Sequence, residues 1–365
     1  MKIAITKIGA NITFSSQNGS AANADIIYAL RTMKGYNHEF TVVTQKTRNT
    51  QLPKAINIKE VQNTKDFNAF DMVLVFNGSI NFFGGQPDEG LFALYRALAK
   101  TNKPIVYVQT DGALYLQKLW PIVKEREWAK NLKESEFEIN PNNVYYLTQG
   151  RIIQKVCNRL EASKNAILPK EVFHFPWEQC ILTEYDRYLP KDPSKYEMRP
   201  YDLGFGGYIR NSYKQRRIEK YYDEPDLDTL LFGNLRGIRL RNTKVQPKIS
   251  YQQMIPTMAQ CKATVIVGDE YYNNHFHTLR MYESLLAGNL ILIDRILDDR
   301  ATFYTGVPNS DWYLVDSTED VRQKLWTATP ELVKKTRDRL IEDRLQIGLN
   351  HILNVQMEKI LCAHQ

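Results

Sequence analysis

The stretch Thr264–Asp294 constrains the fold more than any other part of the chain. It begins with a short apolar run rich in β-branched residues, Thr264–Val267, which is typical of a buried strand. A polar loop follows, then apolar residues at helical spacing, then a Gly-Asn stop and a second apolar run at 290–293. The order strand, helix, strand predicts one unit of a parallel α/β sheet.

Polar side chains follow the first of these strands. Asp269 ends the strand, Tyr272 lies in the loop and Arg280 opens the helix. Parallel sheets bind ligands beyond the carboxyl ends of their strands, and a helix N-terminus with an arginine favours a diphosphate. Glu283 is placed to accept hydrogen bonds from a ribose diol. The alternative is that Arg280 and Glu283, three residues apart on one helical face, form only a surface ion pair.

Composition describes a soluble globular protein of two domains. The 365 residues are 43% hydrophobic and 24% charged, which is enough for two cores. No apolar run reaches membrane-spanning length, and the start lacks the apolar stretch of a signal peptide, so we expect no membrane association and a cytoplasmic location. The four cysteines are far apart and form no metal or redox motif.

The formal net charge is +7, from 48 Lys and Arg against 41 Asp and Glu. The basic residues gather in three clusters, which favours phosphate or nucleic acid as a partner, although solvated faces are the ordinary use of such runs. One cluster is Arg210, Lys214, Arg216, Arg217 and Lys220; a second is Arg236, Arg239, Arg241, Lys244 and Lys248; a third is Lys118, Lys124, Arg126, Lys130 and Lys133, interleaved with Tyr115, Trp120 and Trp128.

Strands and helices alternate along both halves of the chain. Besides the two strands within Thr264–Asp294, the expected strands are Lys2–Ile5, Asp71–Phe76, Ile105–Val108, Val144–Leu147, Val172–Phe175, Asp202–Phe205, Thr229–Phe232 and Trp312–Val315. The expected helices are Asn23–Met33, Gly90–Lys100 and Arg151–Glu161, then helices from Arg216, from Tyr251 and from Pro330 to the end. A proline-bearing linker, 191–200, separates the halves. Two α/β domains with doubly wound parallel sheets are therefore predicted, and no G-x-G-x-x-G follows the first strand, which disfavours a nicotinamide-dinucleotide fold.

Further clusters follow other predicted strands. Asn81, Phe82 and Phe83 lie in a Gly-flanked loop, where the aromatic rings either fold onto the core or stack on a base or sugar. Asp111 either caps a turn or acts as a general base. The segment 204–210 brings glycines and Arg210 to a strand end, where backbone N–H groups can approach a phosphate.

A D-x-D sequence at 226–228 resembles the metal-binding motif of one glycosyltransferase architecture. It precedes a predicted strand, whereas the metal-binding motif follows one. We therefore predict no bound catalytic metal at this position.

Several of these segments resemble the DNA β-glucosyltransferases of T-even phages, which modify 5-hydroxymethylcytosine in DNA with UDP-glucose. They are Asn77–Pro87, Gly206–Arg216, Phe232–Asn234 and Gly268–Glu283, together with MKIAI at the start and Leu119-Trp120-Pro121. They occur in the same order, so the resemblance covers nearly the whole chain. It implies a GT-B fold, with two facing Rossmann-like domains and a C-terminal helix that returns to the first. The implied acceptor domain is 1–192, completed by 352–365, and the implied UDP-sugar domain is 193–351.

The resemblance also implies roles for residues at matching positions. Asp111 matches the catalytic base, and Phe83 lies in the loop that meets the extruded base. The implied donor-site residues are Gly207, Arg210, Arg280, Glu283, Tyr272, Phe232 and Ile249 for UDP, and Asp25, Asp269 and Tyr208 for the sugar. The expected acceptor residues are Asn81, Phe82 and Phe83 for the base and, from the third basic cluster, Lys118, Lys124 and Arg126 for DNA.

Three departures from the family pattern bear on the donor. The second arginine of the family falls at Lys214 by spacing, but the Gln-Arg pair ending at Arg216 realigns with it, so we favour Arg216 as the second diphosphate ligand. Tyr208 replaces a serine, and Asp25 replaces a glutamate. Because these two changes alter the expected sugar pocket and spare the diphosphate site, the donor is UDP-glucose or a UDP-pentose such as UDP-arabinose.

The sequence thus predicts an inverting transferase that moves a sugar from a UDP-sugar to 5-hydroxymethylcytosine in double-stranded DNA, with the base flipped out of the stack. Mg²⁺ is optional in this prediction, and the protein is expected to be a monomer in the cytoplasm of an infected bacterium. Hydroxymethyluracil stays open as the acceptor base. One alternative is a GT-B enzyme for a small molecule or a cell-surface glycan, and another is a non-catalytic DNA-binding protein.

Overall fold

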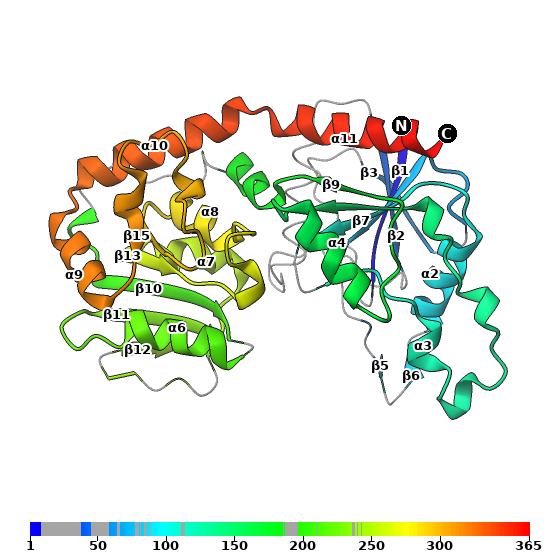
Figure 1. The fold of residues 1–365 in the computed structure, drawn as a ribbon, viewed down its shortest axis with the longest axis horizontal. Coiled ribbons are helices and arrows are strands. Elements are labelled where there is room, and N and C mark those ends of the chain that lie inside the picture. Colours follow the sequence, from blue (N-terminus) through cyan, green and yellow to red (C-terminus); the bar gives the residue numbers. More distant parts are fainter. Residues whose placement is uncertain are drawn as a thin grey trace. The chain divides into compact units, whose positions relative to one another are not determined.

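The computed structural model describes residues 1–8, 38–44, 58–63, 66–76, 80, 82–83, 86–87, 89–110, 114–184, 186, 196–209, 211–235, 238, 240–241 and 243–365. These residues form two compact units (Figure 1). Unit 1 comprises Met1–Cys180 and Asn350–Gln365, and unit 2 comprises Ile181–Leu349.

Unit 1 contains a seven-stranded sheet in the order β3-β2-β1-β4-β7-β8-β9, and every pairing in it is parallel. The strands are β1 (Lys2–Lys7), β2 (Glu39–Thr44), β3 (Ile58–Asn63), β4 (Met72–Phe76), β7 (Ile105–Gln109), β8 (Val144–Thr148) and β9 (Glu171–His174). All five residues of β4, β7 and β8 are buried, as expected for strands that are covered on both faces. A separate short hairpin pairs β5 (Phe82–Phe83) with β6 (Gln86–Pro87).

The helices that the structure describes in unit 1 place apolar side chains in its core. They are α2 (Glu89–Lys100), α3 (Trp120–Val123), α4 (Ile153–Ala162) and α11 (Leu349–His364), with short 3-10 turns η1 (Glu127–Ala129), η2 (Glu134–Glu136), η3 (Pro141–Asn143) and η4 (Trp177–Glu184). In α2, Leu91, Leu94, Tyr95 and Leu98 recur at spacings of three and four residues and are buried. The predicted helix Gly90–Lys100 is thus confirmed, and it begins at Glu89.

The C-terminal helix α11 packs within unit 1, although the residues of unit 2 separate it in sequence from the rest of unit 1 (Figure 1). His38 Nε2 lies 2.7 Å from Asn354 Oδ1 in a buried contact, and Gln356 Nε2 donates to the carbonyl of His174 at 3.3 Å. His364 Nε2 lies 2.6 Å from the carbonyl oxygen of Asn102. These contacts fix α11 to three separate parts of the unit.

Unit 2 contains a six-stranded parallel sheet in the order β12-β11-β10-β13-β14-β15. The strands are β10 (Tyr201–Tyr208), β11 (Thr229–Asn234), β12 (Thr243–Gln246), β13 (Cys261–Ile266), β14 (Leu290–Asp294) and β15 (Leu314–Val315). In chain order this arrangement is 3-2-1-4-5-6, the Rossmann order, which reverses direction between its first and fourth strands. The switch point of unit 2 therefore lies at the carboxyl ends of β10 and β13.

Helices cover both faces of the second sheet. They are α6 (Ser212–Tyr222), α7 (Tyr251–Met258), α8 (Leu279–Leu286), α9 (Thr318–Thr327) and α10 (Pro330–Gln346), with 3-10 turns η6 (Glu270–Tyr272), η7 (Thr302–Tyr304) and η8 (Ser310–Tyr313). Helix α6 packs against α9, and α7 packs against α8. Within the described ranges, no helix combines the length and apolarity that crossing a membrane requires.

The predicted doubly wound α/β class is confirmed, with corrections to individual elements. β10 continues to Tyr208, beyond the predicted end at Phe205, and α6 begins at Ser212, before Arg216. Trp312 belongs to η8, not to β15. The strands β2 (EFTVVT), β3 (IKEVQN) and β12 (TKVQ) were not predicted: the apolar run of β2 is short, and β3 and β12 are mostly polar. The predicted helix Asn23–Met33 lies outside the described residues.

Candidate active site at the switch point of unit 2

Two strand ends define the switch point of unit 2. β10 ends at Gly207 and Tyr208, and its neighbour β13 runs into Gly268 and Asp269. The chain leaves β10 into α6 and leaves β13 through η6 into α8. Since these helices begin at the carboxyl edge of the sheet, their N-termini lie at the edge where α/β folds bind ligands.

The glycines around β10 are required by packing. A Cβ on Gly206 would lie 2.2 Å from the ring of Phe232, and one on Gly204 would lie 2.4 Å from Cys261 Sγ. Gly233 has φ of +125°, and a Cβ there would lie 2.0 Å from the carbonyl oxygen of Gly207. Gly204 and Gly206 therefore lie inside β10 and allow the close approach of β13 and β11, a packing role that the sequence did not indicate. The predicted contact of Gly207 with a phosphate stays a prediction.

Asn211 connects α6 with Asp269, in the loop that follows β13. It is the N-cap of α6, and its side chain accepts the backbone N–H of Lys214 at 2.9 Å. Its Nδ2 donates to Asp269 Oδ1 at 3.0 Å. A second hydrogen bond joins the same two parts, from Asn273 Nδ2 to Tyr213 Oη at 2.9 Å. Sequence reasoning did not identify Asn211, although an Asn directly before a helix is a recognised N-cap signal.

Arg280 and Glu283 form a mostly buried ion pair in the first turns of α8. Arg280 Nη1 lies 2.6 Å from Glu283 Oε2, without hydrogen-bond geometry, and the two side chains are 19% and 2% exposed. A carboxylate that is so little exposed requires a counter-charge. The pair is therefore not the exposed surface pair that the sequence left open as an alternative.

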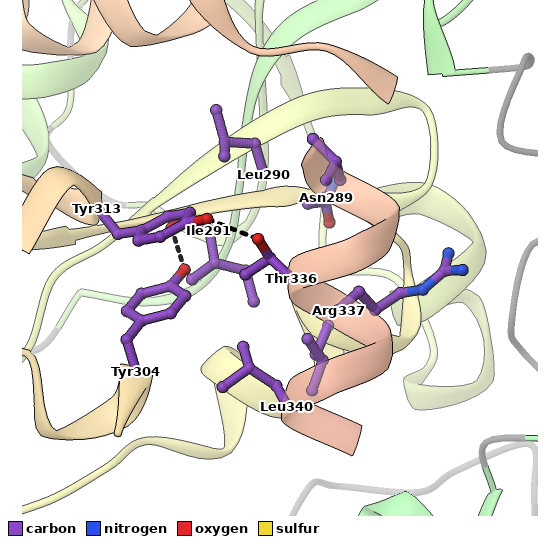
Figure 2. A pocket seen from close by; sticks show the side chains of 10 residues that line it. Asn289, Leu290, Ile291, Tyr304, Tyr313, Thr336, Arg337 and Leu340 are labelled. Atoms are coloured by element: carbon purple, nitrogen blue, oxygen red, sulfur yellow. Dashed lines mark hydrogen bonds between the residues drawn. The ribbon is translucent and has the colours of Figure 1, made fainter. Parts of the chain in front are cut away.

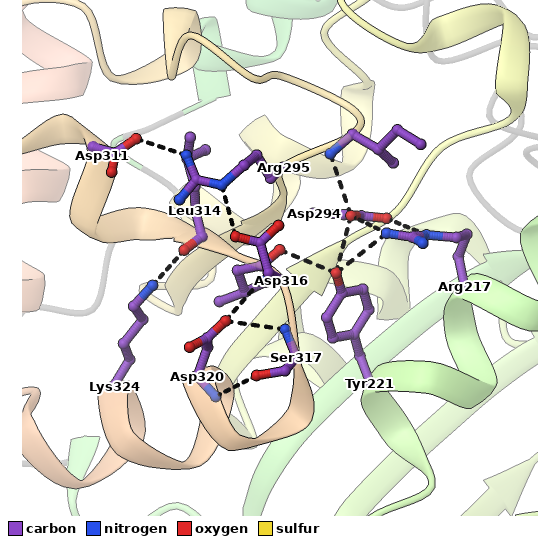
Figure 3. Close-up of polar contacts among 12 residues, drawn as sticks. Arg217, Tyr221, Asp294, Arg295, Asp311, Leu314, Asp316, Ser317, Asp320 and Lys324 are labelled. Atoms are coloured by element: carbon purple, nitrogen blue, oxygen red, sulfur yellow. Dashed lines mark hydrogen bonds and ion pairs between the residues drawn. The ribbon is translucent and has the colours of Figure 1, made fainter.

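A second buried ion pair supports α6 from the neighbouring strand (Figure 3). Asp294, the last residue of β14, accepts a hydrogen bond from Arg217 Nε at 2.5 Å and also forms an ion pair with Arg217 Nη2. The Tyr221 hydroxyl lies 2.9 Å from Asp294 Oδ1 and 3.0 Å from the carbonyl oxygen of Val315. Burial opposes the charge on Arg217, but the hydrogen bond with Asp294 and its negative charge raise the pKa of the guanidinium. Burial, followed by the charge of Asp294, raises the pKa of Tyr221.

The Arg217–Asp294 pair corrects one part of the charge analysis. Arg217, a member of the first basic cluster, pairs with a buried carboxylate of the fold and is not available to bind a phosphate.

Replacing Arg217 by methionine is expected to lower the free energy of unfolding by about 3–5 kcal/mol, since the Asp294 carboxylate stays buried without its cation. Arg217→Met with Asp294→Asn should regain most of this loss. Urea titration measures both effects, and Arg216→Met, at the exposed next position, should stay within about 0.5 kcal/mol of the parent protein. A large loss at Arg216 and none at Arg217 would contradict the assignment.

Other predicted donor residues lie on these elements with different exposures. Arg216 is exposed on α6, and Tyr208 is 50% exposed at the end of β10. Ile249 is partly buried just before α7. Tyr272 lies in η6 with its ring 5.0 Å from that of Phe276. Phe232 has no exposed surface, and its predicted contact with the nucleotide stays a prediction.

Several predicted residues are not placed by the structure. Asp25, Asn81, Asp111 and Arg210 lie outside the described residues. The backbone of Phe82 and Phe83 forms β5, and their side chains are not described. The predicted roles of all these residues stay predictions.

The basic cluster of unit 1 shares its surface with acidic residues. Lys118, Lys124 and Arg126 are exposed, and Lys124 Nζ lies 3.8 Å from Glu125 Oε1. The aromatic rings interleaved with this cluster, those of Tyr115, Trp120 and Trp128, pack partly buried against the core of unit 1. They are therefore mainly core residues and not an exposed stacking surface, which corrects the weight given to them as a nucleic-acid signal.

The described part of the chain contains no group of three or more His, Cys, Asp or Glu side chains arranged to hold a metal ion. Within the D-x-D sequence, Asp226 is 73% exposed and lies 3.6 Å from Arg322. The backbone N–H of Asp228 donates to Asp202 at 3.0 Å. These contacts are those of a turn at the amino end of β11.

A small pocket in unit 2 lies beside the amino end of β14, at the edge of the sheet opposite the switch point (Figure 2). It has room for about one water molecule. It lies between the start of β14 at Leu290 and Ile291 and the α10 residues Thr336 and Leu340, where Tyr313 Oη is 2.5 Å from Thr336 Oγ1. Its size and its position exclude it as a nucleotide site.

Comparison with known proteins shows which family the chain resembles. The model of the family described as Bacteriophage T4 beta-glucosyltransferase matches residues 1–180. The DNA beta-glucosyltransferase of Enterobacteria phage T4 is 28% identical over 369 residues, which cover 94% of this chain and 97% of the relative.

Solved structures share the fold along the whole chain. T4 phage BGT in complex with UDP and Mn²⁺ matches with a TM-score of 0.72 at 24% identity, and covers 100% of this chain and 97% of that one. A trehalose-6-phosphate enzyme from E. coli bound with UDP-2-fluoro glucose matches with a TM-score of 0.53 at 9% identity, and covers 99% of each chain. The predicted GT-B fold class is confirmed by these matches. The predicted resemblance to the T-even phage DNA β-glucosyltransferases is confirmed as well, by the model of that family over residues 1–180 and by the phage T4 enzyme along nearly the whole chain.

Proposed function

We propose that this chain is a DNA glycosyltransferase, which moves a sugar from a UDP-sugar to the hydroxymethyl group of 5-hydroxymethylcytosine in double-stranded DNA. The observation that carries the proposal is the set of polar side chains at the switch point of unit 2, in a chain that aligns over 94% of its length with a DNA beta-glucosyltransferase. A Rossmann-order sheet binds nucleotides at this point. The likeness to T4 phage BGT in complex with its UDP-glucose substrate supports the same class of donor.

The donor diphosphate binds at the N-terminal ends of α6 and α8 in this proposal. Arg280, Arg216 and Arg210 supply positive charge, and the unpaired amides of the helix ends supply further donors. Glu283 accepts hydrogen bonds from the ribose diol, and Gly207 and Tyr272 lie against the nucleotide. Because arginines and helix ends neutralise the diphosphate, a divalent cation is optional. A structure of the T4 relative contains Mn²⁺ together with UDP.

The chemistry is a single displacement with inversion. Asp111 accepts the proton of the hydroxymethyl group while its oxygen forms a bond to the anomeric carbon of the sugar. The bond from that carbon to the phosphate oxygen breaks, and its electrons leave with UDP. Arginines stabilise the charge that grows on the leaving diphosphate.

The acceptor cytosine is flipped out of the duplex, because a stacked base cannot bring its hydroxymethyl group to a donor held in a protein site. Asn81, Phe82 and Phe83 hold the flipped base. Lys118 and Arg126, with Lys124, contact the DNA phosphates without reading sequence.

The sugar is glucose or a pentose such as arabinose. Tyr208, half-exposed at the end of β10, occupies more of the expected sugar pocket than the serine of the family does, which favours a smaller sugar. The second candidate function, a GT-B enzyme for a small molecule or a cell-surface glycan, is supported by the fold match to the trehalose-6-phosphate enzyme.

Mass spectrometry of nucleosides tests the proposal. The protein is incubated with hydroxymethylcytosine DNA and either UDP-glucose or UDP-arabinose, and the DNA is then digested. We expect an added hexose or an added pentose on hydroxymethylcytosine, and no addition to unmodified cytosine DNA. Parallel reactions with hydroxymethyluracil DNA establish which base accepts the sugar.

Salt dependence separates the two candidate functions. A DNA acceptor held by the three phosphate contacts proposed above should lose about 40-fold in affinity between 50 and 200 mM salt, and a small-molecule acceptor should lose far less. If neither donor adds mass to hydroxymethylated DNA, while UDP-sugar is turned over on a small acceptor, the DNA assignment is wrong.

A further inference from the structure

Asn211 lies where α6 meets the loop that follows β13. The backbone N–H of Lys214 is a donor, so the side-chain atom that faces it must be the acceptor Oδ1. This contact fixes the orientation of the amide, and Nδ2 therefore faces the Asp269 carboxylate at 3.0 Å. One side chain begins α6 with its oxygen and holds Asp269 with its nitrogen.

Asp269 does not serve the structural role that its position offers. It is the N-cap of η6, where a carboxylate ordinarily accepts the amides of the following turn, but its side chain makes no such cap. Among the described residues, Asn211 is its side-chain hydrogen-bond donor. The amide thus keeps the carboxylate turned toward α6, at the switch point.

The same region has a second connection between these elements, because Asn273 donates to the hydroxyl of Tyr213 at 2.9 Å. Ser212 and Tyr213 are the first two residues of α6, so their backbone N–H groups have no acceptor inside the helix. The two hydrogen bonds therefore fix the relative position of an anion-binding helix end and a carboxylate. A nucleotide sugar presents the complementary pair of groups, a diphosphate and a hydroxylated ring.

We propose that Asn211 is a positioning residue for the donor sugar. It acts by holding the Asp269 carboxylate at a fixed position relative to the N-terminus of α6. This inference rests on the proposed function, in which Asp269 contacts the sugar. Asn211 touches neither the sugar nor the reacting atoms. Its effect should therefore appear in binding of the sugar part of the donor, and only through Asp269.

Asn211→Ser separates the two uses of the side chain. Serine is also a good N-cap, so α6 keeps its cap, but the shorter side chain cannot also reach Asp269. Asn211→Ala loses both contacts and reports the cost of the cap. Asn140 caps η3 of unit 1 by accepting the N–H of Asn142, so Asn140→Ser is the matched control.

Calorimetric titration of the full chain with UDP-glucose, UDP-arabinose and UDP tests the inference. Because Asp269 loses the hydrogen bond that orients its carboxylate, we expect Asn211→Ser to weaken binding of the preferred UDP-sugar by about 10-fold. Binding of UDP, which lacks the sugar, should change by no more than about twofold. The melting temperature of Asn211→Ser should lie between those of Asn211→Ala and the parent protein, because the cap is kept and the contact with Asp269 is lost. UDP-sugar binding by Asn140→Ser should equal that of the parent protein.

A double-mutant cycle with Asp269→Ala shows whether the effect passes through that carboxylate. In the Asp269→Ala background, Asn211→Ser should change UDP-sugar binding by no more than about twofold, since coupled residues are not additive. Equal loss of UDP and UDP-sugar binding, or the same loss in both backgrounds, would overturn the inference and leave the proposed function intact. If the parent protein binds neither UDP-sugar, both are wrong.

Discussion

Replacing Asp111 by asparagine is expected to lower turnover of UDP-sugar on hydroxymethylated DNA by about 10²–10⁴-fold, the usual contribution of a general base. Asparagine has nearly the same shape but cannot accept the proton of the attacking hydroxyl. The variant should bind UDP and hydroxymethylated DNA as the parent protein does, because neither contact requires the carboxylate. Single-turnover measurement of sugar transfer with saturating donor isolates the chemical step.

The control for this variant is Asp299→Asn, which makes the same chemical change at an exposed position of unit 2. It should keep the parental rate. Near-normal turnover by Asp111→Asn, in protein that melts at the parental temperature, would assign the base elsewhere. A loss of DNA binding along with turnover would instead indicate that Asp111 caps a turn, the alternative that its sequence position left open.

The fold was largely predictable, because apolar runs bounded by turn residues are a strong local signal. The runs that became β4, β7, β8 and β14 are buried along their whole length, so sequence and burial agree there. β12 was missed because two of its four residues are exposed at the edge of the sheet, where polar side chains are tolerated.

The end of β10 was misread for a different physical reason. A Gly-Gly pair ordinarily indicates a turn. Here Gly206 lies within a strand because the ring of Phe232, from the neighbouring strand, occupies the space of its missing side chain. A contact between residues on two strands has no trace in the local sequence.

The candidate site was predictable in its parts and not in its connections. Asp269, Arg280 and Glu283 were recognised from their places after a strand and at a helix start. The hydrogen bond from Asn211 to Asp269 joins residues 58 positions apart, and the Arg217–Asp294 pair joins residues 77 positions apart. Such pairs depend on how strands are ordered in the sheet, which spacing along the chain does not encode.

Replacing Arg280 by methionine is expected to have two separable effects. The Glu283 carboxylate, 2% exposed, would lose the cation that lies 2.6 Å away, which should lower the free energy of unfolding by about 3–5 kcal/mol. If Arg280 also binds the diphosphate, kcat/KM for the donor should fall by about 10²–10³-fold, as for other donors aimed at developing charge. Urea unfolding and donor kinetics measure the two losses independently.

The double variant Arg280→Met with Glu283→Gln decides between a structural ion pair and a diphosphate ligand. Glutamine removes the buried negative charge, so most of the lost stability should return, since the unpaired charge is its main cause. Donor turnover should stay as low as in Arg280→Met, because no guanidinium is present to hold the leaving group. Arg280→Lys keeps a charge but loses the fork that matches two phosphate oxygens, so it should be intermediate in turnover. Recovery of both stability and turnover in the double variant would show that the Arg280–Glu283 pair only stabilises α8 and that other residues bind the diphosphate.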